Sequence, residues 1–97
     1  MSRKEYKNYS KYMNTFIFRK IWGEYILLFS DEDAGKLIKA VFQHTAGESA
    51  SEYLQDRKDL LRVAARMIHV LETNSISHLE KIGKLDEIRQ RIEQEDH

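Results

Sequence analysis

The sequence predicts an all-α protein, a small helical bundle in which a helical hairpin packs on a long C-terminal helix. Apolar residues recur at the three- and four-residue spacing of amphipathic helices over most of the chain. The chain has no proline and only four glycines, residues that sheet-rich and loop-rich proteins need at their turns. Its 97 residues are enough for one domain with one core. We therefore expect a single helical domain over residues 1–97.

The first arm of the predicted hairpin covers residues 15–29. On a helical wheel, its bulky side chains share one broad arc, formed by Ile17, Phe18, Ile21, Trp22, Tyr25, Leu28 and Phe29. Arg19, Lys20 and Glu24 lie on the opposite side. The pattern predicts an amphipathic helix that buries this apolar arc.

The second arm covers residues 31–46. Ser30 is a natural N-cap, and the acidic residues that follow it suit the positive end of the helix dipole. The predicted buried face consists of Ala34, Leu37, Ile38, Val41 and Phe42. Gly47 is expected to end the helix. The short connection between the two arms predicts a tight helical hairpin.

The C-terminal helix is predicted over residues 52–94, after a restart signal at Ser49 or Ser51. Apolar residues recur at alternating intervals of three and four, and the stretch TNSIS at 73–77 interrupts them with poor helix formers. The helix is thus either continuous or broken near residue 75. Residues 78–97 form a charged helical end with a thin apolar stripe. This stripe needs a partner, either the same domain or a second chain, in a homodimer through residues 61–92.

Residues 1–14 form a basic, tyrosine-rich N-terminal segment. Within residues 1–20, six basic side chains stand against Glu5, in a chain with a net charge of zero. One interpretation is that the tyrosine rings pack on the core and the lysine stems cover their edges. The other is that lysines contact phosphates while the rings stack on nucleic-acid bases.

The sequence lacks the motifs of common enzymes. The absence of cysteine excludes disulfides, thiolate zinc sites and cysteine nucleophiles. There is no P-loop, no HExxH motif and no nucleophile elbow. His44 with Glu48 and His69 with Glu72 have helical spacing, but no third ligand clusters with either pair. We predict no catalytic residues, no metal and no cofactor.

The apolar clusters are also far shorter than the roughly 20 residues that a membrane-spanning helix needs. No apolar run of the kind found in secretory signals follows the first charges. We therefore expect a cytoplasmic protein with no membrane partner.

Residues 16–48 combine an aromatic residue followed by an acid, a hydrophobic pair, an Asp-Glu-x-Ala-Gly turn and a helix that ends near glycine. The positions that carry this pattern are Phe18, Trp22, Glu24, Ile26, Phe29, Asp31, Glu32, Ala34, Gly35, Leu37, Ala40, Phe42 and Gly47. In these positions the chain resembles a small all-helical domain of unknown function found in phage and prophage proteins. The resemblance covers about a third of the chain. It implies an all-α fold and a phage context, and it carries no catalytic residues.

The leading hypothesis is a small non-enzymatic phage-type protein that binds another protein. It would block or recruit a host, defence-system or replication protein in the host cytoplasm, and it is a candidate anti-defence or anti-CRISPR protein. The alternatives are an accessory nucleic-acid-binding protein that uses the N-terminal segment, and a self-associating structural protein. The candidate partner-binding residues are Tyr6, Lys7, Tyr9, Lys11 and Tyr12 in one patch, and Arg62 and Arg66 in a second.

Overall fold

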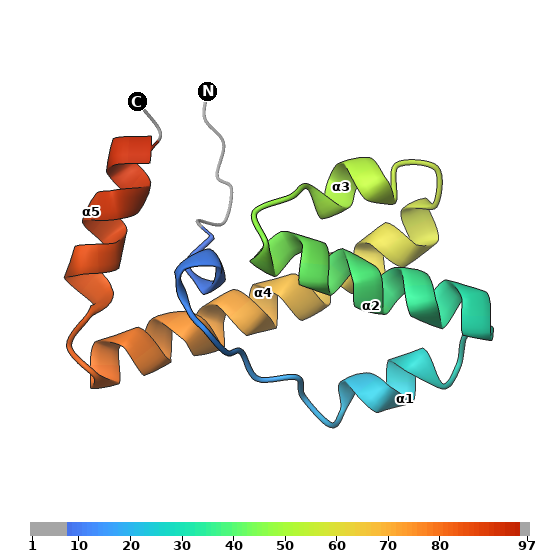
Figure 1. The fold of residues 1–97 in the computed structure, drawn as a ribbon. Coiled ribbons are helices and arrows are strands. Elements are labelled where there is room, and N and C mark those ends of the chain that lie inside the picture. Colours follow the sequence, from blue (N-terminus) through green and yellow to red (C-terminus); the bar gives the residue numbers. More distant parts are fainter. Residues whose placement is uncertain (1–7, 96–97) are drawn as a thin grey trace.

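Figure 1 shows the computed structural model of the chain, which describes residues 8–95. The elements in chain order are the 3₁₀ turn η1 (Ser10–Tyr12) and the helices α1 (Trp22–Ile26), α2 (Asp31–Thr45), α3 (Ala50–Tyr53), α4 (Lys58–Lys81) and α5 (Leu85–Glu95). Residues 8–95 contain helices and turns but no strand. The predicted all-α class is confirmed.

Helix α4 runs through the centre of the molecule, and the other elements pack around it (Figure 1). Helix α2 packs along the first half of α4, and the short helix α3 packs against both α2 and α4. The segment that precedes α1 crosses α4, and α5 lies at the far end of α4 beside η1. Three apolar clusters result: one between α2, α3 and α4, one around Trp22, and one between η1, α4 and α5.

Helix α2 begins and ends where the sequence predicts. The Ser30 hydroxyl accepts a hydrogen bond from the backbone N–H of Asp33, at 3.2 Å. At the other end, Gly47 has a φ of +90°, a conformation that glycine adopts without strain. The Asp33 carboxylate is bound by both terminal nitrogens of Arg57, at 2.9 and 3.0 Å. This bidentate pair fixes the start of α2 to the start of α4.

The structure corrects the prediction of one helix over residues 15–29. Only Trp22–Ile26 form a helix, and residues 15–19 lie outside any helix. The run of β-branched and aromatic residues at 15–18 loses side-chain freedom in a helix, which disfavours helix there. Outside a helix, Phe16 packs edge-on against Phe42, and Phe18 packs against Trp22, with ring centroids 5.3 and 4.9 Å apart.

The predicted apolar arc of residues 15–29 is therefore mostly not buried. Trp22 is 2% exposed, and Tyr25 and Phe29 are half-buried. The remaining members, Ile17, Phe18, Ile21 and Leu28, are exposed, and so is Phe42, which was expected on the buried face of α2.

The predicted C-terminal helix is divided at different places than expected. The polar stretch at 73–77 lies inside α4, where the Thr73 and Ser75 hydroxyls donate hydrogen bonds to backbone carbonyls four residues earlier, at 2.9 Å each. The chain leaves the helix at residues 54–57 and again at 82–84. Gly83, with a φ of +74°, permits the second turn. The charged end at 78–97 thus consists of the last turn of α4, this turn, and α5.

The apolar stripe of α5 is covered within the same chain. Ile88 and Ile92 pack with Leu79 of α4 around the ring of Tyr9, which is 6% exposed. The stripe therefore already has its partner. The uncovered stripe on α5 that favoured a homodimer through residues 61–92 is thus absent, although Ile82 is 50% exposed, and the homodimer stays a prediction.

Candidate functional site

A buried carboxylate fixes the start of the segment that leads to α1. Glu72, in the middle of α4, is 3% exposed. One of its oxygens accepts hydrogen bonds from the backbone N–H groups of Tyr9 and Ser10, at 2.7 and 3.2 Å. The other oxygen lies 2.6 Å from the Ser10 hydroxyl and 2.7 Å from Nε2 of His44. Both oxygens are thus satisfied, as a buried carboxylate requires.

Asn8 extends this cluster to the end of α2. Its side-chain amide donates to the backbone carbonyl of His44, at 2.7 Å. Its side-chain oxygen accepts from the backbone N–H of Lys11, at 3.0 Å. Three parts of the chain are thereby joined: residues 8–11, the last turn of α2, and the middle of α4.

The cluster of serine, histidine and glutamate does not have the geometry of a nucleophilic site. In such a site the histidine is hydrogen-bonded to the serine and removes its proton. Here the Ser10 hydroxyl bonds to Glu72, and His44 bonds to the same carboxylate rather than to the serine. Ser10 is also buried. The arrangement is suited to holding the segment in place.

The histidine–acid pairs seen in the sequence do not form a metal site. His44 binds Glu72 rather than Glu48, and the His69 side chain is exposed on α4. Over residues 8–95, no group of three or more histidine and acidic side chains is placed to hold a metal ion.

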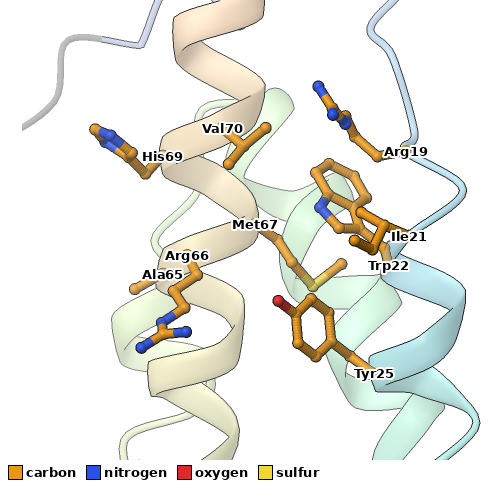
Figure 2. A pocket seen from close by; sticks show the side chains of 9 residues that line it. All are labelled: Arg19, Ile21, Trp22, Tyr25, Ala65, Arg66, Met67, His69 and Val70. Carbon is orange, nitrogen blue, oxygen red and sulfur yellow. The ribbon is translucent and has the colours of Figure 1, made fainter.

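Beyond η1, the segment crosses α4 and forms one wall of a groove. Trp22 anchors the segment by packing with Val41, Met67 and Leu71. Between residues 19–25 and α4 lies a hollow of about 410 Å³. Figure 2 shows the rings of Trp22 and Tyr25 on the side facing α4, with the Met67 side chain reaching toward them.

Polar side chains stand on both sides of the hollow. Arg19 projects from the segment, whereas Arg66 and His69 come from α4 (Figure 2). A second hollow, of about 320 Å³, is lined by Arg62 and Asp59 and shares Tyr25 and Arg66 with the first. The two hollows therefore adjoin each other along α4, and together we call them the groove.

The acid in the groove wall is bound by a neighbouring arginine. Arg57 donates to both oxygens of Asp59, at 3.2 and 3.0 Å. Hydrogen bonds from the Arg57 guanidinium hold the pKa of Asp33 and of Asp59 below the usual range of aspartate. Asp59 is thus ionised and paired at neutral pH, and the arginines determine the net charge of the groove.

Exposed apolar side chains occur along residues 17–28, the part of the chain that includes the groove wall. Leu27 and Leu28, at the corner between α1 and α2, are 86% and 82% exposed, and Ile17 and Ile21 are more than half exposed. Single exposed apolar residues are common on soluble proteins, but a group of them often marks an interaction surface. Of these, Ile21 lines the groove, Leu27 and Leu28 follow the wall residues in sequence, and Ile17 lines a separate hollow with Asn74 and His78.

The side chains of the predicted N-terminal patch do not form an exposed surface among the described residues. Tyr9 is buried, and Tyr12 is half-buried with the cationic groups of Lys11 and Arg91 at 5.6 and 5.1 Å from its ring. Lys11 also pairs with Glu95, at 3.3 Å. The two remaining members of the patch, Tyr6 and Lys7, lie outside the described residues.

The second predicted pair is brought together. Arg62 and Arg66 are exposed on one face of α4, and both line the groove. Neither the buried position of Glu72 nor the groove itself was predicted from the sequence. A signal for Glu72 was present, because this acid occupies the apolar register of α4 between Ile68 and Ser75. For the groove there was no such signal, since it depends on residues 15–21 not being helical.

Comparison of the chain with protein-family models, with curated proteins and with solved structures finds no match. Among residues 8–95, no helix has the length and the apolar character needed to cross a membrane. The resemblance to a phage domain stays a prediction. The function has to be inferred from the geometry of the groove and of the surface around it.

Proposed function

We propose that the protein is a non-enzymatic protein-binding domain, and that the groove between residues 19–25 and α4 is its contact surface together with the exposed apolar side chains beside it. The observation that carries this proposal is the exposure of Ile21, which lines an apolar groove, and of Leu27 and Leu28, which follow the groove wall in sequence. Interfaces combine an apolar centre with a polar, often arginine-rich surround. The groove and its flanks have this composition.

In this proposal the apolar side chains supply affinity and the arginines supply orientation. Complete burial of a leucine or isoleucine side chain is worth about 1.5–3 kcal/mol, so Ile21, Leu27 and Leu28 offer a large gain to a partner that covers them. Arg66 can then form hydrogen bonds at the edge of the contact. The wall is held by Glu72 and Trp22, so little ordering is needed on binding.

The partner is proposed to be a host, defence-system or replication protein in the context of phage infection. The resemblance of residues 16–48 to phage domains supports this part of the proposal. The mechanism would be steric, because a domain bound through the groove covers a working surface of its partner. Tyr9, one of the rings expected to stack on bases in the nucleic-acid alternative, is buried against α4 and α5, so that alternative has less support than protein binding.

The proposal is tested by using the tagged full-length chain as bait in a lysate of its native host. The informative variant is Leu27→Asp with Leu28→Asp, and the matched control is Gln90→Asp with Gln94→Asp on the exposed side of α5, which adds the same charge. We expect the wild type and the control to capture the same protein in similar amounts. The leucine variant should capture at least about tenfold less of it.

Circular dichroism melting of the two variants establishes that both are folded. Two results would reject the proposal: no protein retained by the wild type above empty beads, or equal retention of the same protein by the leucine variant.

A further inference from the structure

We infer that the groove binds an acidic amphipathic helix of the partner protein, a segment with carboxylates beside a row of aliphatic or aromatic side chains. This inference rests on the proposed function and specifies its partner. The first argument is charge. Arg19 lines one wall, and Arg62 and Arg66 line the other, one helical turn apart. The acid in these walls, Asp59, is already bound by Arg57.

These arginines are available to a partner. Among residues 8–95, the arginines that form ion pairs with carboxylates are Arg57, with Asp33 and Asp59, and Arg89, with Asp86. Arg19, Arg62 and Arg66 form none with the described carboxylates. A chain with a net charge of zero thus has a locally cationic groove. Such a surface selects and steers negatively charged partners.

The floor of the groove requires the partner to be apolar as well as acidic. Above the buried Trp22 and Met67, which are 2% and 1% exposed, the half-buried Val70 and Tyr25 and the exposed Ile21 form the accessible apolar surface of this floor. The hollow of about 410 Å³ lies within the range of roughly 300–1,000 Å³ that is typical of ligand-binding pockets. A purely acidic segment would leave the floor uncovered, whereas an amphipathic one fills it.

The length of the site fits a short helix, and no sheet edge is present among the described residues to take up a strand. The groove follows α4 from Asp59 to Val70, a distance of about 16 Å at the helical rise of 1.5 Å per residue. A helix of three turns has this length. Residues 8–95 contain no strand, so there is no sheet edge among them on which an extended peptide could add a strand.

Two other occupants fit less well. Single-stranded nucleic acid would stack on exposed rings, but of the two rings that line the groove Trp22 is buried and Tyr25 is half-buried, and exposed Leu28 and Ile21 contribute nothing to a phosphate backbone. A second copy of the chain would have to offer its acidic helix α5, but Ile88 and Ile92 of that helix are buried in the chain's own core. The occupant that fits the groove best is therefore a segment of a different protein.

The test is a selection of peptides from a random 15-residue display library on the full-length protein. We expect the enriched peptides to carry a net negative charge and to have leucine, isoleucine or phenylalanine at helical spacing. Trp22 is the only tryptophan, so binding of tryptophan-free synthetic copies is measured by its fluorescence. Because the contacts are ionic, affinity should fall as salt rises from about 50 to 300 mM.

The decisive variant reverses two groove charges, Arg62→Glu with Arg66→Glu. We expect it to weaken binding at least about tenfold, equivalent to 1.4 kcal/mol. The matched control, Lys81→Glu with Lys84→Glu, makes the same change in net charge at exposed positions near the end of α4 and should alter affinity less than about twofold.

The inference is overturned if no peptide is enriched, if the enriched peptides are neutral or basic, or if they bind the arginine variant as tightly as the wild type. Stronger competition by a single-stranded oligonucleotide than by unlabelled peptide would also overturn it. Neutral peptides whose binding is lost in Leu27→Asp with Leu28→Asp would reject the acidic helix and leave the proposed protein-binding function standing. That function is decided separately by capture from the lysate.

Discussion

Oε2 of Glu72 lies 2.7 Å from Nε2 of His44, which joins the middle of α4 to the last turn of α2 inside the protein. The other carboxylate oxygen binds the backbone of Tyr9 and Ser10. The same side chain therefore positions a helix pair and also the beginning of the segment that crosses α4 to form the groove wall. Core stability and the shape of the candidate binding surface both depend on Glu72.

Glu72→Gln should lower the free energy of unfolding by about 1.5–3 kcal/mol. The amide keeps the size of the side chain but removes the charge, and it places an N–H₂ group where one carboxylate oxygen accepts hydrogen bonds. Urea unfolding followed by circular dichroism measures the loss. Glu80→Gln, at an exposed position of the same helix, serves as the control and should stay within about 0.5 kcal/mol of wild type. Equal stability of the two variants would show that the Glu72 cluster is not formed.

Trp22→Ala should cost about 3–5 kcal/mol, whereas Leu28→Ala should change stability by less than about 0.5 kcal/mol. The reason is that Trp22 is buried between α2 and α4 while Leu28 is exposed. Thermal or urea unfolding distinguishes the two. If residues 15–29 formed one amphipathic helix with a buried arc, the two substitutions would both be costly, and that result would contradict the structure.

Replacement of two glycines by alanine should change the free energy of unfolding in opposite directions. Gly35→Ala should raise the free energy of unfolding by up to about 1 kcal/mol, because the residue lies inside α2 and nothing lies within 4 Å of the added methyl group. Gly47→Ala should lower it, because Gly47 has a φ of +90° and the new methyl group would lie 3.3 Å from the Lys11 side chain. Denaturant midpoints compare both variants with wild type. A stabilising Gly47→Ala would mean that α2 does not end as described.

Acid should weaken the link between α2 and α4. Hydrogen bonds from Arg57 lower the pKa of Asp33 and Asp59 in the folded state, so their contribution is fully present above the unfolded value of about 3.9. It is lost as the pH falls below that value through the lower pKa of the folded state. Unfolding free energies measured from about pH 5 to pH 2 should fall more steeply for the wild type than for Arg57→Gln. Parallel curves would contradict the assigned pairing.

Local signals in the sequence were enough for some elements and not for others. Helix α2 could be predicted because its cap at Ser30, its acidic first turn and its stop at Gly47 are all local. The segment at residues 15–21 could not. A helical wheel shows that its apolar residues can share one face, but it contains no information on whether packing against Phe42 and α4 stabilises another conformation better.

The candidate site, too, could be predicted from the sequence only in part. Arg62 and Arg66 were recognisable because their spacing places them on one helical face whatever the rest of the fold. Their role as a groove wall depends on the opposite wall at Arg19 and Tyr25, which is distant in sequence. The N-terminal tyrosines were ambiguous because a ring at helical spacing suits both a core and an exposed patch. The burial of Tyr9 depends on Glu72 and α5, far along the chain.

The most direct test of a protein-binding groove is photo-crosslinking in the native host. A benzophenone side chain is placed at Ile21, on the edge of the groove, and at Gln90, on the exposed side of α5, as the control. The protein–protein contact proposed here predicts a specific adduct with one partner protein from position 21 and none from position 90. The absence of an adduct at position 21, or the same adducts from both positions, would contradict it.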